Sequence, residues 1–266
     1  MGLTIHYSLT TRGGDAEARK LIASLHQTAQ DLPFQELGDI VDLSGTACDF
    51  ERCDRKNPLH WMLCQAQGSV RLHQVDYIGR GRKVDAWLTA SPSRMVGFNA
   101  WPGEGCEESN FGLCQYPAEI LRPGFGPVKT NMAGWRWSSF CKTQYASNPD
   151  CGGVVNFLRC HLSVVAMLDQ AKKLGCLKDV SDEGGFWQKR DVPTLVKEIG
   201  SWNQMIAAFG GRLKDALGEG FQSAISEYPN FERLEAAGQG SLPPELQRVF
   251  ALMERVRARP REGLLL

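Results

Sequence analysis

The chain has 266 residues, of which 42% are hydrophobic and 23% are charged, and its 30 basic residues are balanced by 30 acidic ones. This composition provides enough apolar residues for a sizeable core. The neutral charge balance argues against a protein that binds nucleic acid mainly through phosphates, because such proteins usually carry an excess of Lys and Arg.

The same composition gives expectations about location. The sequence contains no apolar run near the roughly 20 residues of a membrane span, and Met1 leads into a strand-like segment rather than a secretory signal. We therefore expect a cytoplasmic protein with no membrane partner, whose nine cysteines are reduced.

Residues 3–43 have the pattern of a strand, a helix and a second strand. Residues 3–9 are strand-like, and residues 15–32 place apolar side chains on one face at helical spacing. Pro33 ends the helix, and residues 37–43 alternate as in a half-buried strand.

The middle of the chain is less regular. A short helix is predicted from Asn57-Pro58 to Leu63, a hairpin from residues 70–78 and 83–90, and a strand at 95–101. Seven glycines and four prolines fall between Gly97 and Gly134 without clear periodicity. We predict an irregular segment at 97–134, of the kind that is often functional.

A second strand–helix–strand unit follows at 135–181, with a strongly apolar helix at 154–174. An amphipathic helix then begins at Pro193, and shorter helical pieces follow Gly218. The predicted fold is α/β or α+β, with two βαβ units arranged either ferredoxin-like or as a doubly wound sheet. We expect residues 1–217 to form one domain, with the Gly/Pro-rich insertion 97–134, and residues 218–266 to be a helical appendage.

Chemistry is expected where loops follow the strands of the second unit. In a right-handed crossover both strands run the same way, so their following loops lie at one edge of the sheet, where ligands tend to bind. The first loop and the adjoining helix supply the substrate-binding candidates Lys142, Gln144, Tyr145, Asn148 and Arg159. The second loop supplies Asp182 and Glu183 as catalytic candidates, with Trp187 as an apolar wall that also binds substrate. A structural interpretation stays open, because Asn148 can cap the helix and the sequence after Asp182 suits an ordinary turn.

Two further candidates lie in the Gly/Pro-rich segment. Glu104 and Glu107 are proposed as catalytic carboxylates, because the glycines beside Glu104 allow close backbone approach. The alternative is that these side chains are solvated and that the loop is held down only by its apolar residues.

Four possible zinc ligands lie within seventeen residues: Cys48, Cys53, His60 and Cys64. The spacing of the first two is loose for a zinc site, and a short, partly buried helix explains the other two. No metal site and no cofactor are assigned. The sequence also contains no Walker A, GxGxxG, HExxH or GxSxG motif.

These observations favour an enzyme, such as a hydrolase or transferase, or an enzyme-like binder of a small polar or anionic molecule. Its site would lie at the strand edge, between the loops at 103–115, 142–153 and 181–187. The alternative is a non-enzymatic interaction or regulatory subunit with a protein partner or a second copy of itself, because seven tryptophans and the C-terminal helices could form a binding surface. No nucleic-acid partner is expected.

Overall fold

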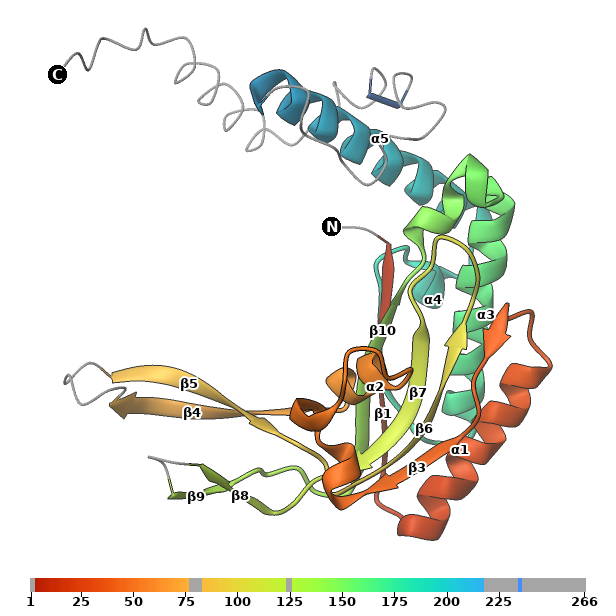
Figure 1. Ribbon diagram of the computed structural model, residues 1–266. Helices are drawn as coiled ribbons and strands as arrows, with labels where there is room; N and C mark the ends of the chain where they lie inside the picture. Colours follow the sequence, from red (N-terminus) through yellow and green to blue (C-terminus); the bar gives the residue numbers. More distant parts are fainter. Residues whose placement is uncertain (1–2, 77–82, 123–125, 218–233, 236–266) are drawn as a thin grey trace, which may run out of the picture.

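The computed structural model describes residues 3–76, 83–122, 126–217 and 234–235. Its main sheet contains the strands β1 (Thr4–Thr11), β2 (Glu36–Leu37), β3 (Val41–Ser44), β6 (Arg94–Trp101), β7 (Ser109–Gln115), β10 (Trp135–Lys142) and β11 (Leu177–Asp182). The order is β11-β1-β10-β7-β6-β2, with β3 also paired to β6, and these pairings are all antiparallel (Figure 1). The fold is therefore mixed α+β, and the doubly wound alternative is wrong.

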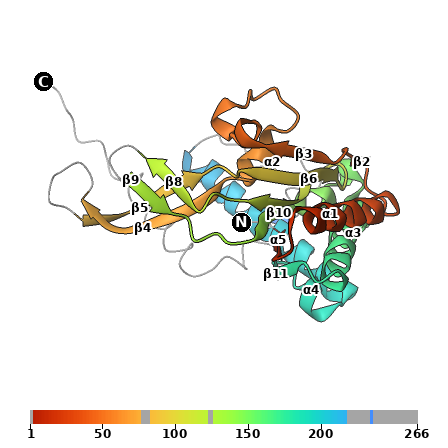
Figure 2. The ribbon, with the colours of Figure 1, turned by 90° about the horizontal axis from the view of Figure 1, so that it is seen from below.

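One face of the sheet is covered by α1 (Asp15–Gln30) and α3 (Gly153–Lys173), which pack side by side (Figures 1 and 2). Both helices bury an apolar stripe, represented by Ile22 and Leu168, which are fully buried. The short α4 (Phe186–Lys189) and the long α5 (Val192–Leu217) follow β11. None of the described helices is both long and apolar enough to cross a membrane.

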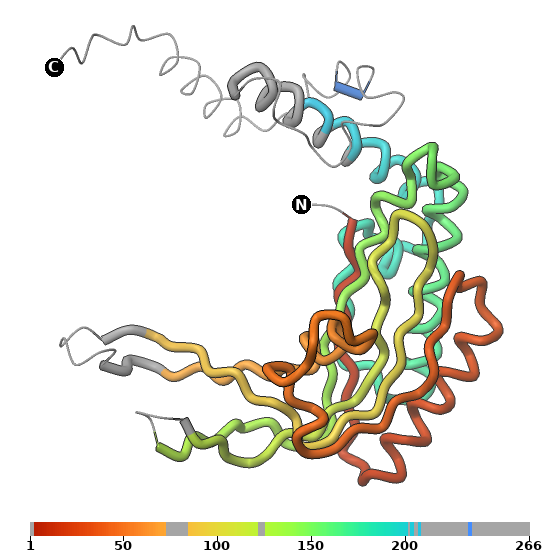
Figure 3. Tube along the Cα trace, viewed as in Figure 1, coloured from red at the N-terminus to blue at the C-terminus, as the bar shows by residue number. Residues whose placement is uncertain are grey.

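The sheet is curved, and α2 (His60–Gln65) lies on its concave side (Figure 3). Two hairpins project from the sheet, one formed by β4 (Gly68–Asp76) and β5 (Lys83–Ala90), the other by β8 (Glu119–Arg122) and β9 (Gly126–Lys129) (Figure 1). Short 3₁₀ turns occupy Gly45–Cys48, Phe50–Arg52, Gln144–Ser147 and Pro149–Cys151.

Most elements expected from the sequence are present, but the segment 97–134 is not irregular. It contains β7, β8 and β9, and β7 is a central strand of the main sheet. Six of its seven residues are buried, so it lacks the alternation that identifies a half-buried strand. The predicted strand at 37–43 is divided into β2 and β3. The helical appendage predicted for 218–266 lies, apart from residues 234–235, outside the described residues.

The relative direction of β10 and β11 follows from their pairing. Both are antiparallel to β1, which lies between them, so β10 and β11 run in the same direction. Their carboxyl ends therefore reach the same edge of the sheet, where Thr4 pairs with Lys142 and Ile5 with Asp182. The expected convergence of the two following loops is confirmed.

The sheet is partly divided between β7 and β10. These strands pair only at Trp135↔Gln115 and Arg136↔Cys114. Beyond these pairs, side chains replace the backbone ladder: the Tyr7 hydroxyl and the Trp137 indole N–H both donate to the backbone carbonyl of Asn110, each at 2.8 Å. This junction places Asn110 at the base of the concave side.

Candidate ligand-binding groove

The edge predicted from the sequence brings Lys142 and Glu183 to either side of Thr4. Lys142 pairs with Thr4 across β1 and β10. The backbone N–H of Glu183 donates to the Thr4 carbonyl at 3.1 Å, and the Glu183 carboxylate accepts from the Thr4 N–H at 3.0 Å. The Lys142 ammonium donates to the Tyr145 hydroxyl at 3.2 Å and lies 4.6 Å from the centre of that ring. Each of these predicted site residues is therefore engaged with a neighbour.

Behind this edge lies a buried chain of three polar side chains that sequence reasoning did not assemble. Thr143 Oγ1 is 3.0 Å from Nδ1 of His161, and Nε2 of His161 is 3.3 Å from Oδ2 of Asp182. A hydroxyl, an imidazole and a carboxylate in line resemble the groups of a hydrolase triad. However, Thr143 and His161 have no exposed surface. The three side chains therefore connect the ends of β10 and β11 through the middle of α3, and they are closed to a substrate.

Asp182 is stabilised as a carboxylate in this position. Its Oδ1 accepts from the Gly184 N–H at 2.9 Å, and its Oδ2 accepts from the Trp187 N–H at 2.8 Å. Burial alone would raise the pKa of Asp182, but the hydrogen bond and charge of His161, together with the two backbone N–H groups, hold it below its ordinary value. A low pKa and full hydrogen bonding indicate a structural carboxylate rather than a proton donor.

Gln144 and Asn148 also have structural partners. Gln144 is fully buried; its Oε1 accepts from the Leu3 N–H at 3.2 Å and its Nε2 donates to Asn203 of α5 at 3.3 Å. Asn148 accepts from the Asp150 N–H at 3.1 Å and caps the 3₁₀ turn Pro149–Cys151, not the helix α3 that the alternative interpretation named, whose N-cap is Gly152. Gln144 therefore joins α5 to the sheet.

Arg159 and Trp187 lie apart from Lys142. The Arg159 guanidinium donates to the Pro33 carbonyl at 2.5 Å and to Asn156 Oδ1 at 2.8 Å, so it fastens the segment after α1 to α3. Trp187 is half-buried under the guanidinium of Arg190, 4.4 Å from the ring centre. Both side chains stabilise packing between elements.

The two glutamates of the Gly/Pro-rich segment have different surroundings. Glu104 is exposed, and its backbone carbonyl accepts from Asn156 Nδ2 at 3.0 Å. Glu107 lines a cavity of about 400 Å³ together with its neighbour Glu108. Of the residues predicted as catalytic, Glu107 is thus the one found at the wall of a cavity described below.

A series of adjoining cavities crosses the concave side of the sheet, and Gln65 of α2 lines three of them. The middle cavity has a volume of about 390 Å³. Side chains from three neighbouring strands form its floor: His6, Ser8, Ser138, Phe140, Asp179 and Ser181. We call the whole series the sheet groove.

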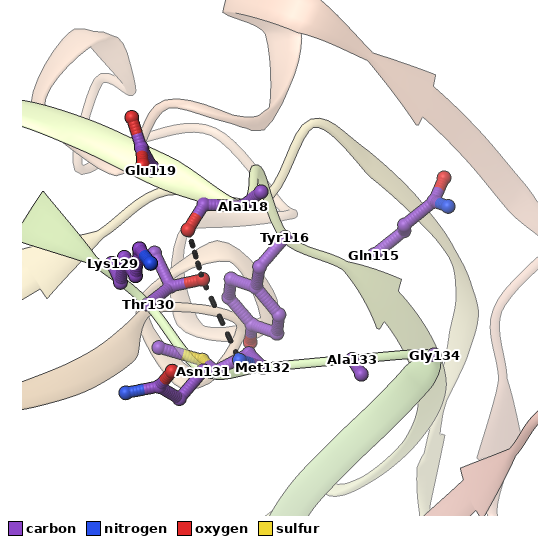
Figure 4. Close-up of a pocket in the computed structure, with 10 residues that line it drawn as sticks. All are labelled: Gln115, Tyr116, Ala118, Glu119, Lys129, Thr130, Asn131, Met132, Ala133 and Gly134. Carbon is purple, nitrogen blue, oxygen red and sulfur yellow. Dashed lines mark hydrogen bonds between the residues drawn. The ribbon is translucent and has the colours of Figure 1, made fainter.

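The sheet groove extends toward the base of the hairpins. The cavity at this end has a volume of about 530 Å³ and is shown in Figure 4. It is lined by the segment that leads into β8, which carries Tyr116, and by the segment that follows β9. Thr130 Oγ1 donates to the Pro117 carbonyl at 2.6 Å; it also lies 3.3 Å from the Ala118 carbonyl and accepts from the Met132 N–H at 3.5 Å (Figure 4 draws the last two contacts). Tyr116, Thr130, Asn131 and Met132 also line the next cavity along the groove, so the two are continuous.

Two cavities of the sheet groove are lined by side chains of opposite charge. Arg136 and Lys178 line one cavity, of about 390 Å³, which adjoins the cavity at the hairpin base. Glu107 and Glu108 line the cavity at the far end of the groove. Arg136 and Phe140 are four residues apart on β10, which corresponds to about 13 Å along a strand. The groove therefore has a cationic region and an anionic end, and the middle cavity, lined mainly by serine hydroxyl groups together with His6, Phe140 and Asp179, lies between them.

A sequence signal for the groove exists in β1 and β10. Alternate residues of β1, such as His6 and Ser8, face the groove while Tyr7 and Leu9 are buried; Ser138 and Phe140 repeat this pattern on β10. Phe140 is 40% exposed, which is unusual for a ring at the centre of a sheet. Period-two alternation shows that one face is open, but it does not show that α2 and the hairpins build walls around it.

The described residues contain no group of three or more His, Cys, Asp or Glu side chains placed to hold a metal ion. Cys48, Cys53, His60 and Cys64 are all in this part of the chain and do not converge. Cys48 is buried in the core, and the His60 ring packs against Phe50.

Comparison with protein-family models, with curated proteins and with solved structures gave no match.

Proposed function

We propose that the protein binds a small polar molecule in the sheet groove and that an anionic group of this molecule lies between Arg136 and Lys178. The ligand class is the one expected from the sequence, but the site moves from the loop edge to the concave side of the sheet. Binding of this kind is needed by an enzyme and by a ligand-sensing regulatory subunit alike.

The observation that carries the proposal is the presence of two unpaired cations in one cavity. Arg136 on β10 and Lys178 on β11 lie on either side of β1, and neither has an ion-pair partner among the described residues. Two like charges that line one cavity repel each other, and an anion between them relieves this repulsion. A guanidinium also offers paired N–H donors that fit a carboxylate or a phosphate.

The groups around Arg136 and Lys178 indicate that these two cations line an anion-binding site and are not simply solvated surface charges. The same cavity is lined by hydroxyl and amide side chains that can donate hydrogen bonds to a ligand: Ser8, Ser69, Asn131 and Ser138. Gln67 and Thr130 also line it, but their donors are used by backbone carbonyls. Small, polar side chains leave room for a ligand and can satisfy its remaining acceptors.

We further propose that the strands β11-β1-β10-β7 form a ferredoxin-like core that β6, β2 and β3 extend at one side. The strand order and the position of α1 and α3 on one face support this arrangement. In such a core, the uncovered face of the central strands β1 and β10 is the face that carries the groove.

The experiment is a titration with inorganic phosphate and with citrate at low salt, measured by isothermal titration calorimetry. Arg136→Gln and Lys178→Gln should each weaken binding by roughly tenfold, and salt should weaken it in the unchanged protein. Lys173→Gln is the matched control, because Lys173 is exposed on α3, on the other side of the sheet. Equal affinity in all three variants would remove the assignment.

A second candidate function, association with another copy of this chain, is favoured by apolar side chains on the projecting hairpins. Trp87 on β5 is 65% exposed and Leu121 on β8 is 79% exposed. Exposed residues of this size on projecting elements are typical of interaction sites. Size-exclusion chromatography with light scattering tests it: a dimer that Trp87→Ser and Leu121→Ser dissociate would support the proposal, and a monomer at high concentration would oppose it.

A further inference from the structure

We propose that the anionic end of the sheet groove is a binding site for an organic cation, a guanidinium or an ammonium group. This site is separate from the anion site at Arg136 and Lys178, and it stands on different residues. Its cavity, the acidic pocket, is lined by Trp61, Gln65, Glu107, Glu108, Asn110 and Phe140.

The first argument is an unused hydrogen-bond acceptor at the wall of the acidic pocket. Asn110 is 1% exposed, and its Oδ1 has no hydrogen-bond partner among the described residues. The Nδ2 atom of the same amide donates to Gln65 Oε1 at 3.2 Å, and this oxygen also accepts from the Ser139 hydroxyl at 2.6 Å. The Asn110 amide directs its nitrogen toward Gln65. Oδ1 therefore requires a donor from elsewhere, and buried polar groups without partners are rare in proteins.

The second argument is uncompensated negative charge. Neither Glu107 nor Glu108 forms an ion pair with another described residue. Lys142 is bonded through its backbone carbonyl to the Glu107 N–H at 2.9 Å, but its ammonium is directed to Tyr145. The nearest cation along β10 is thus committed to another group, and the pocket offers acceptors to whatever enters it.

The third argument is the presence of two exposed aromatic rings. Trp61 is 66% exposed and Phe140 is 40% exposed, and both line the acidic pocket. Cations bind favourably over the faces of such rings, with Trp the strongest partner. Rings, carboxylates and a carbonyl oxygen together are the groups that recognise an alkylammonium or a guanidinium.

A metal ion fits this pocket less well. A hard divalent cation needs several oxygen ligands in one cluster, and the described residues contain no group of three carboxylate, His or Cys side chains that could provide it. The exposed rings add nothing to the binding of a small hydrated ion. The arrangement therefore favours an organic cation with an apolar or flat body.

The test compares N-acetyl-L-arginine amide (arginine amide below) with N-acetyl-L-citrulline amide, which has the same shape but a neutral urea group, so that the guanidinium is the only charge that differs and no other ammonium group is present. Calorimetry of the full-length protein should show that arginine amide binds at least roughly tenfold more tightly. The double variant Glu107→Gln/Glu108→Gln should lose this preference. Glu104→Gln is the control, because Glu104 is an exposed carboxylate of the same segment that does not line the pocket.

A further variant separates binding from folding. Trp61→Leu removes an exposed ring, so the fold should persist while arginine amide binding falls. Phosphate binding at Arg136 and Lys178 should be unchanged in every one of these variants, so the two proposals can fail independently. Equal binding of the two amides, or full retention of the preference in the double variant, would overturn the inference.

Discussion

The side-chain amide of Asn110 donates to Gln65 Oε1 at 3.2 Å, and this contact joins strand β7 to helix α2 across the point where the main sheet divides. Gln65 also accepts from Ser139 on β10. One glutamine therefore holds a helix against two strands whose backbones pair with each other only at two residue pairs, and it lines three cavities of the sheet groove.

Gln65→Ala should lower the free energy of unfolding by about 1–3 kcal/mol, because it leaves the Asn110 amide and the Ser139 hydroxyl without their acceptor. Urea denaturation followed by circular dichroism measures the change. Gln188→Ala, at an exposed position of α4, should have little effect. A Gln65 variant as stable as the control would show that the contact does not hold the junction.

Asp182→Asn should destabilise the protein by about 3 kcal/mol at neutral pH, because the carboxylate accepts hydrogen bonds from His161 and from two backbone N–H groups. The pKa of Asp182 is lower in the folded state than in the unfolded chain. Its ionised form therefore stabilises the fold above the unfolded pKa, and this contribution is lost as the pH falls through the folded pKa.

The stability difference between the natural protein and Asp182→Asn should consequently shrink as the pH is lowered into the acid range. Denaturation curves at several pH values check this, with Asp39→Asn, an exposed aspartate, as the reference variant. A difference that stays constant with pH would mean that the charge of Asp182 is not what stabilises the site.

Cysteine reactivity should divide the thiols into two groups. Burial raises the pKa of Cys114 and of Cys141, and it raises the pKa of Cys176 to about 11, so these thiols carry little reactive thiolate at neutral pH. Cys53 and Cys64 are partly exposed. Iodoacetamide followed by mass spectrometry should modify the latter pair first in the folded protein and all five in denaturant. Early modification of Cys141 would contradict the buried position of its side chain on β10.

Gly105→Ala should destabilise the protein by at least about 1–2 kcal/mol, because Gly105 has φ of +76° and an added methyl group would strike the backbone of Tyr145 and Ala146. Thermal unfolding measures the loss. Gly14→Ala is a suitable control, since a methyl group there meets open space. The segment that carries Glu107 follows Gly105, so arginine amide binding should weaken in the Gly105 variant alone.

The sequence was informative where helix and strand patterns are local. The strand–helix–strand units at 3–43 and 135–181 follow from periodicity, and the shared direction of β10 and β11 brings Lys142 and Glu183 to one edge as expected. Thr4 lies between them because β1 runs antiparallel to both strands, which the sequence did not indicate. The contacts that the Lys142 and Glu183 side chains make could not be predicted from local sequence patterns. Whether Lys142 faces a ligand or Tyr145 depends on a 3₁₀ turn whose geometry the sequence does not display.

Two larger features required long-range information. The strand β7 has six consecutive buried residues with Gly112 among them, so its sequence resembles a loop in a Gly-rich segment rather than a strand. The sheet groove depends on Gln65 meeting Asn110 and Ser139, which are 45 and 74 residues away in the chain. Such contacts arise from the fold as a whole and have no signature near either residue.

The main sheet has few backbone hydrogen bonds along the line between β7 and β10. The backbone ladder there is two residue pairs long, and Tyr7 and Trp137 continue it through the carbonyl of a single residue, Asn110. A guest that bonds to the free oxygen of that same asparagine touches both halves of the sheet at once. A ligand bound in the acidic pocket would thus link β7 and β10, and the backbone amide hydrogens on the facing edges of these two strands should exchange more slowly when the pocket is occupied.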